Sequence, residues 1–308
     1  MSPLALTEHL PMPDTKILEL FGNPTKLTKR LNWPKAIQKQ SCPFTNTRCF
    51  KIRKSQPKIS IGTCAVRYGK DEKAVIICPN RLLERKQVFT DCVHLLTLHE
   101  PGNEFHVVPE VSIPGGSVDY FLVSAKAGKV RDFVAIEFQT LDTTGTVWPE
   151  RQRALKSLGL TVRSSDVKST KSFGMNWKMT AKTTLVQLHH KIQTFEHIHK
   201  HLVLVVQNRL LDYMRSEFDF AHLANARLGD AMHFHAYNLS ESGNAWRLEL
   251  ESRVSTDAEG IAKCLGLQAE AKVELEVIVA ELEKKMSAKT VLTLGPTPIG
   301  PIEHTSTD

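Results

Sequence analysis

The chain has 308 residues, of which 41% are hydrophobic and 24% are charged. This composition excludes an intrinsically disordered protein and is sufficient for one large domain with small additions. No apolar run approaches the roughly 20 residues that span a bilayer, so no membrane association is expected. The N-terminus lacks the basic start and apolar middle of a signal peptide, which predicts a cytoplasmic protein.

Basic residues are concentrated in two parts of the chain, and the net charge is +7. Residues 26–58 contain ten Lys or Arg and no acid, and residues 151–200 contain ten against two acids. From residue 251 to the end, acids outnumber bases ten to six. Each basic run alone is either a solvated face or a phosphate-binding surface. Two such runs on either side of one region favour contact with a phosphate backbone.

The first half of the chain is predicted to pass from helix to sheet. Residues 1–80 are expected to form short helices that lead into an irregular, cysteine-bearing segment. Apolar residues at helical spacing predict one helix over 81–99. Three extended segments follow at 105–113, 117–125 and 132–141, separated by Gly, Pro and charged turn residues, which predicts consecutive strands of one sheet.

The second half is predicted to alternate helices and strands. A basic helical region is expected over 148–194, with a break at the sequence SSDVKSTKS. It is followed by a buried strand, a helix, two strands and an amphipathic helix, expected at 201–206, 208–218, 231–239, 246–254 and 258–286. The mixture predicts an α/β fold with a central mixed sheet flanked by helices. The expected domains are a helical and cysteine-bearing segment (1–80), the main domain (81–290) and a flexible tail (291–308).

Four cysteines lie within 37 residues, spaced C-x6-C-x14-C-x13-C. In a reducing compartment, four such thiols favour a soft metal ion over disulfides, because thiolates satisfy a tetrahedral ion. The pattern therefore predicts a metal site of the Cys₄ type, with four cysteine ligands. No CxxC pair is present, so four unrelated buried cysteines remain the alternative on spacing alone. The residues are Cys42, Cys49, Cys64 and Cys78.

Carboxylates occur in two of the expected strands. Asp119 lies in the otherwise apolar SVDYFLV, where an acid is unfavourable unless it is paired or metal-bound. Glu137 and Gln139 lie two residues apart in VAIEFQT and therefore share one face of a strand. The pattern is compatible with a Mg²⁺ site for phosphodiester hydrolysis. By itself it also occurs by accident in many sheet proteins.

The local sequences resemble the NotI and EagI family of type II restriction endonucleases. SCPFTNTRCFKI, GTCAV and VIICPNRLL are similar to its four-cysteine motif, and EFQTLD is similar to the sequence of its catalytic strand. The segment SFGMNWKMTAKTTLVQLHHKI is similar to a Gly-x-Asn-Trp stretch in EagI-like enzymes. The similarity extends over roughly residues 15–210.

The resemblance implies a PD-(D/E)XK nuclease core and roles for individual residues. Asp119 and Glu137 are expected to bind Mg²⁺, Gln139 takes the place of the usual Lys and orients water or phosphate, and Glu110 is a third acid. The four cysteines are expected to hold one structural iron, or zinc, per chain. Expected DNA contacts, from this segment and from the basic helix after it, are Arg48, Lys51, Arg53, Asn176, Lys178, Lys182 and Lys191.

The expected function is cleavage of double-stranded DNA at a GC-rich palindrome containing GGCC, such as CGGCCG, by a homodimer in the bacterial cytoplasm. Two alternatives stay open: a structure-specific repair or recombination nuclease, and a non-catalytic, metal-stabilised DNA-binding protein. The histidines between His189 and His201 do not fall at metal-binding helical spacing. They are expected to line a helix end, a dimer contact or the DNA.

Overall fold

In the computed structural model, the described residues are 15–26, 31–113, 116–267 and 279. Residues 15–267 belong to one compact unit. Its described part contains seven α-helices and a central mixed sheet of seven strands, so the predicted α/β class is confirmed. Within these ranges, no helix combines the length and the apolar character needed to cross a bilayer.

The central sheet has the strand order β13-β15-β14-β12-β9-β8-β7. β7, β8 and β9 form an antiparallel meander, β12 pairs in parallel with both β9 and β14, and β15 returns antiparallel. The strands are β7 Glu104–Ile113, β8 Gly116–Lys126, β9 Lys129–Gln139, β12 His201–Gln207, β13 Ala224–Asn225, β14 Met232–Ser242 and β15 Ala245–Thr256.

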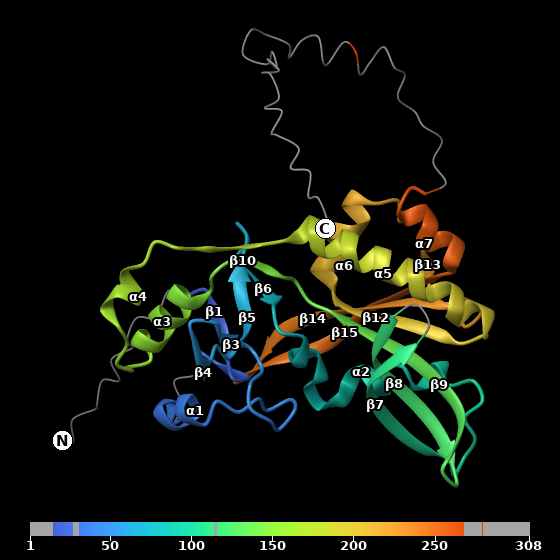
Figure 1. Cartoon of the computed structure of the whole chain (residues 1–308), viewed down its shortest axis with the longest axis horizontal. Coiled ribbons are helices and arrows are strands. Elements are labelled where there is room, and N and C mark those ends of the chain that lie inside the picture. The colour runs from blue at the N-terminus through green and yellow to red at the C-terminus, as the bar shows by residue number, and fades with distance from the viewer. Residues whose placement is uncertain (1–14, 27–30, 114–115, 268–278, 280–308) are drawn as a thin grey trace, which may run out of the picture. The chain divides into compact units, whose positions relative to one another are not determined.

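Helices cover both faces of this sheet, as Figure 1 shows for α5, α6 and α7 on one side. Alternate residues of β12 pack into two different cores: Leu202 and Leu204 face α5, α6 and α7, whereas Val203 faces the short helices before β7. Burial on both faces explains why HLVLVVQ is buried at every position. The covering helices are α5 Trp177–His197, α6 Asn208–Glu217 and α7 Ala258–Cys264, opposite η1 Pro79–Lys86, α2 Gln87–Thr90 and η2 Val93–Leu95.

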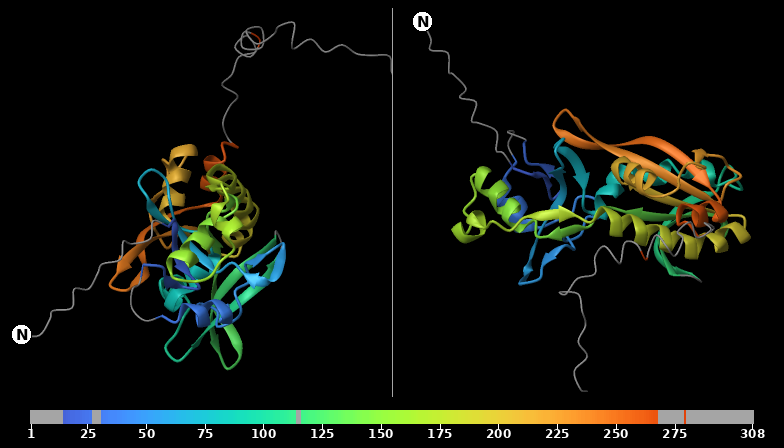
Figure 2. Two further views of the ribbon diagram at one scale, coloured as in Figure 1. Left: turned by 90° about the vertical axis from the view of Figure 1, so that its left-hand side faces the viewer. Right: turned by 90° about the horizontal axis from the view of Figure 1, so that it is seen from above.

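A second, four-stranded antiparallel sheet, in the order β2-β1-β5-β6, occupies the N-terminal region (Figure 2). The prediction of short helices there was therefore wrong apart from one helix, α1. These strands are too short to show alternation in the sequence. The elements are β1 Ile17–Leu20, β2 Asn23–Pro24, α1 Trp33–Lys39, β3 Ile52–Arg53, β4 Gln56–Ser60, β5 Thr63–Tyr68 and β6 Lys73–Ile76.

The single helix predicted over 81–99 was also wrong. The segment forms η1, α2 and η2 separately, because Glu84 has an extended ψ of 123° and Arg85 and Lys86 have positive φ angles of 51° and 56°. The kink directs the Glu84 carboxylate toward β15, where it accepts hydrogen bonds from the Leu248 N–H and the Arg247 guanidinium. Tertiary ion pairing thus overrides the helical spacing of the apolar residues.

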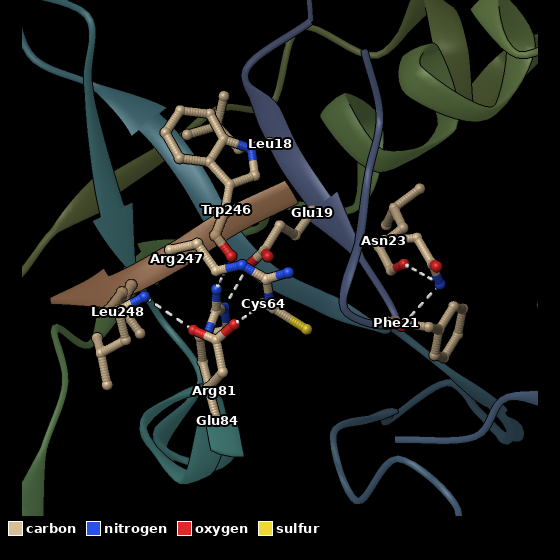
Figure 3. Close-up of polar contacts among 12 residues, drawn as sticks. Leu18, Glu19, Phe21, Asn23, Cys64, Arg81, Glu84, Trp246, Arg247 and Leu248 are labelled. Carbon is tan, nitrogen blue, oxygen red and sulfur yellow. Dashed lines mark hydrogen bonds and ion pairs between the residues drawn. The ribbon is translucent and has the colours of Figure 1, made fainter. Parts of the chain in front are cut away.

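A buried ion network joins the two sheets (Figure 3). Arg81, only 1% exposed, donates to Glu19 of β1 at 2.8 Å, to Glu84 at 2.9 Å and to the Trp246 carbonyl of β15 at 2.8 Å. A buried guanidinium is stable only when its charge and donors are satisfied in this way. The network holds the segment after Cys78 against the central sheet.

The chain between β9 and β12 contains β10 Thr143–Gly145, α3 Trp148–Ser157, α4 Ser164–Lys168, β11 Phe173–Met175 and α5. The predicted helical character of this region is confirmed for α3 and α5. The predicted break contains the short helix α4. The predicted strands 105–113, 117–125 and 132–141 correspond to β7, β8 and β9, and those after residue 200 correspond to β12, β14 and β15. Of the predicted final helix, α7 is present as far as Cys264, and the part from residue 268 lies outside the described residues except at 279.

Candidate active site and cysteine cluster

Three acids lie in a row across β7, β8 and β9. The antiparallel register sets Glu110 of β7 opposite Asp119 of β8. The pairing of β8 and β9 reaches Tyr120 and Ile136, and the next step along both strands sets Asp119 opposite Glu137. Opposite residues in an antiparallel pair project from the same face. The structure therefore brings together the carboxylates that the sequence pattern singled out.

β8 and β9 separate where Asp119 and Glu137 meet. The last paired positions are Tyr120 and Ile136. Beyond them, the Asp119 carboxylate takes the place of a backbone acceptor and receives the Phe138 N–H at 2.8 Å. This bond fixes the half-buried carboxylate beside Glu137, and the opening strands leave space for side chains from the helical layer.

Glu137 is paired with a lysine from that layer. Lys191 of α5 donates to the Glu137 carboxylate at 2.6 Å and to the Ser117 carbonyl at 2.5 Å. Burial raises the pKa of Glu137 to about 7, the Lys191 hydrogen bond and charge oppose that rise, and the charge of Asp119 adds to it. The site therefore holds two carboxylates and one ammonium group within a small volume.

Gln139 lies two residues beyond Glu137 on the same strand. Its side-chain amide donates to the Thr140 carbonyl at 2.7 Å, so it is turned toward its own backbone. Glu137, Gln139 and Lys191 line one small pocket together with Gln187 of α5. Glu110 is exposed and has a φ of 52°, an uncommon backbone conformation for a residue with a side chain.

The contact of Lys191 with Glu137 was not predicted from the sequence, where Lys191 was expected to bind phosphate on the surface. A signal was present, because Lys191 shares its helix face with the buried Leu188, Ile192 and Phe195. A lysine on the apolar face of a helix is unfavourable unless it is paired. Its partner on β9, 54 residues away, is identified only by the fold.

All four N-terminal cysteines are buried, and the fold brings them to one region. Cys64 lies on β5 and Cys78 follows β6, and the Cys64 thiol donates a hydrogen bond to the Cys78 sulfur. Cys49 lies near enough for the charges of Cys78 and Cys42 to raise the pKa of its thiol, although burial is the larger cause.

The predicted Cys₄ metal site is not formed by these side chains as they lie. In the described ranges, no group of three or more His, Cys, Asp or Glu is arranged to hold a metal ion, which corrects the expectation of a metal-bound geometry. The physical reason is protonation: Cys64 keeps the proton that it shares with Cys78, whereas coordination requires thiolates. The subscript counts ligands, since position 4 of the chain is Leu4 and lies outside the described residues.

Backbone N–H groups point at three of these sulfurs. Cys49 receives Lys51 and Gly62, Cys64 receives Gly22, and Cys78 receives Asn80 and Arg81. Such donors stabilise the thiolate form, which is the form that binds metal.

Gly62 belongs to this arrangement for a conformational reason. It has a φ of +71°, and a Cβ there would overlap the ring of Phe21. A glycine is therefore required two residues before Cys64, at the position where its N–H meets Cys49. Once the thiols lose their protons, the donor set and its backbone surroundings fit one soft ion.

The basic residues of the cysteine segment are largely engaged within the fold. Lys51 is half-buried and donates to the Ile77 carbonyl. The Arg53 guanidinium lies 4.0 Å from the centre of the Trp148 ring and 3.8 Å from the Asp166 carboxylate. Arg48 is exposed, but it donates to the Lys58 carbonyl at 2.5 Å. Contact with DNA by these three side chains would need these bonds to rearrange.

The predicted DNA contacts on α5 have a different environment. Lys178 and Lys182 are exposed, and neither forms an ion pair with a described residue. Asn176 is half-buried at the N-cap, where its carbonyl accepts the Thr180 N–H while its side chain makes no capping bond. The exposed lysines and the pocket beside Glu137 thus belong to one helix.

A buried histidine group on β12 and β14 was not predicted. His233 lies 3.2 Å from His201 between ring nitrogens, and His235 contacts the Cys92 thiol at 3.6 Å. Burial lowers the pKa of His233 to about 4 and that of His235 to about 3. Arg253 further lowers the pKa of His235. Both rings are therefore neutral in the folded protein.

The neutral state of His235 predicts a pH-dependent stability. In the unfolded chain the ring binds a proton below its ordinary pKa of 6.5, so the free energy of unfolding falls as the pH decreases from 6.5 toward 3. Between pH 7 and pH 5, the wild type should lose about 2 kcal/mol more stability than His235→Phe. Urea unfolding at the two pH values measures this difference. The exposed-site variant His190→Asn should behave as the wild type, and an equal loss in His235→Phe would contradict the prediction.

No protein-family model matches this chain, and no curated protein is significantly similar to it.

Proposed function

We propose that this protein is a metal-dependent endonuclease that cleaves double-stranded DNA at a specific sequence. The observation that carries the proposal is the pairing of Asp119 with Glu137 where β8 and β9 separate. Two carboxylates fixed on adjacent strands suit a hard divalent cation. The exposed Lys178 and Lys182 on the neighbouring helix suit a polyanionic substrate.

The order of elements supports a PD-(D/E)XK nuclease core. An antiparallel meander, β7-β8-β9, is followed by the helix α5 and by β12, which pairs in parallel with β9. Asp119 on the second strand and Glu137-x-Gln139 at the end of the third occupy the positions of that motif. The observed sheet therefore agrees with the resemblance in the local sequences.

The residues present fit a bound Mg²⁺, which Asp119 and Glu137 would hold. When bound, the ion supplies a positive charge that activates water and neutralises the phosphate. In the overall reaction the hydroxyl of a water molecule bonds to phosphorus, the bond from phosphorus to a sugar oxygen breaks, and that oxygen gains the remaining proton. Gln139 would orient the water or the phosphate through its amide, and Glu110, opposite Asp119, would hold a second ion or position water.

The proposed substrate is a palindrome, GC-rich and containing GGCC, and the proposed active form is a homodimer, because two identical sites related by a two-fold axis match a palindrome. In this proposal the four cysteines, once deprotonated, hold one structural iron or zinc ion that fixes the N-terminal segment. Four thiolates leave no open coordination position, so this ion has no part in hydrolysis.

Incubation of plasmid DNA with the full chain tests the function. With Mg²⁺ we expect discrete fragments, and with EDTA we expect none. Nicks confined to junctions or mismatches would favour a repair or recombination nuclease. The absence of cleavage with retained DNA binding would leave a metal-stabilised DNA-binding protein. Light scattering of the DNA complex should give twice the mass of one chain.

A further inference from the structure

Lys191 occupies an unusual place for a lysine. Only 7% of it is exposed, and it lies on the face of α5 that packs against the central sheet. Its neighbours on that face, Thr184, Leu188 and Ile192, are all buried. Placing an ammonium group there is unfavourable unless other groups compensate for the lost hydration. Its length and direction bring it to the point where β8 and β9 separate.

The local backbone accommodates this side chain. Gly116, at the start of β8, has no Cβ, and a Cβ there would come within 3.3 Å of the Lys191 Cε. The next residue, Ser117, offers its carbonyl to Nζ at 2.5 Å. Because β8 no longer pairs with β9 at this level, the ammonium group fits between the two strands.

Lys191 has donor capacity to spare. An ammonium group has three N–H donors, and among the described residues Nζ bonds to two acceptors, Glu137 and Ser117. The third N–H remains for a ligand in the pocket that Lys191 shares with Glu137 and Gln139. Gln139 cannot supply a positive charge, and its amide is bonded to the Thr140 carbonyl.

We propose that Lys191 contacts the scissile phosphate and supplies, from α5, the positive charge that PD-(D/E)XK nucleases place at the position of Gln139. This inference rests on the proposed nuclease function. Negative charge builds on the non-bridging phosphate oxygens as the hydroxyl of water bonds to phosphorus and the bond to the sugar oxygen breaks. The third N–H of Lys191 donates to one of these oxygens and stabilises that charge.

The test compares single-turnover cleavage of duplex DNA at saturating Mg²⁺ for several variants. Lys191→Met should cleave at least about 100-fold more slowly than the wild type. Its DNA affinity, measured with Ca²⁺ in place of Mg²⁺, should change by less than about threefold. The double variant Gln139→Lys/Lys191→Gln should cleave at least about tenfold faster than Lys191→Gln, because the charge returns to the pocket from β9. A purely structural lysine would not be rescued in this way.

Lys200 offers a matched control. It donates to Asp132 at 2.6 Å, the same distance as the pair of Lys191 with Glu137, but five residues away along β9, or about 17 Å. Lys200→Met should lower the melting temperature and leave the cleavage rate within about twofold of the wild type. Lys191→Arg, which keeps the charge, carries the comparison where Lys191→Met does not fold, and it should retain at least a tenth of the wild-type rate.

The outcomes separate this inference from the proposed function. Wild-type cleavage rates in a folded Lys191→Met protein would overturn the role of Lys191 and leave the nuclease assignment intact. A double variant as slow as Lys191→Gln would likewise overturn it. A wild-type protein that cleaves no DNA with Mg²⁺ would instead overturn the proposed function on which the inference rests.

Discussion

Asp119→Asn and Glu137→Gln are expected to lower the rate of DNA cleavage at least about 1,000-fold, equivalent to about 4 kcal/mol of transition-state stabilisation. Each variant keeps the size of the side chain and removes the negative charge that would bind Mg²⁺. In Asp119→Asn the amide oxygen can still accept the Phe138 N–H, so the opening of β8 and β9 should persist. Single-turnover rates at saturating Mg²⁺ measure the effect.

The control for this experiment lies on the same sheet. Glu104 is an exposed carboxylate at the start of β7, and Glu104→Gln should cleave at the wild-type rate within about twofold. DNA affinity in Ca²⁺ and melting temperature should stay close to wild type in Asp119→Asn. A variant that keeps its fold and still cleaves at the wild-type rate would remove these two carboxylates from the mechanism.

The central sheet could be predicted because its strands have a clear local signal. β8 and β9 are long and apolar, and β12 is apolar at every position because both of its faces are covered. The pairing of Asp119 with Glu137 could be anticipated as well, since each acid interrupts an apolar strand. Their separation by a short turn favours antiparallel neighbours.

The N-terminal sheet could not be predicted in this way. β1 and β6 have four residues each, too few to show a period. The break in the helix predicted over 81–99 depends on Glu84, whose partners on β15 lie more than 160 residues away. Lys191 was missed for the same reason: its location in the active site depends on a contact between distant segments, and local periodicity does not reveal such contacts.

The cysteine cluster carries the second prediction with a large effect, which concerns metal content and stability together. Purified wild-type protein should contain about one iron or zinc ion per chain by elemental analysis, with visible absorbance if the ion is iron. Cys64→Ser should abolish that content and lower the free energy of unfolding by at least about 3 kcal/mol, because metal coordination stabilises the surrounding segment. DNA affinity should fall with it, since the segment carries Arg48 and Arg53.

Cys92→Ser separates loss of the metal from loss of a buried thiol. Cys92 is as fully buried as Cys64, but it lies beneath the central sheet beside His235. The substitution should cost about 1–3 kcal/mol through burial of a hydroxyl group, while the metal content stays at one ion per chain. In both variants any remaining cleavage should keep its requirement for Mg²⁺, because the cysteines and the carboxylates would hold different ions. Metal-free wild-type protein with full stability and full DNA affinity would contradict the structural role of the cluster. Equal metal content in Cys64→Ser and Cys92→Ser would show that Cys64 is not a ligand.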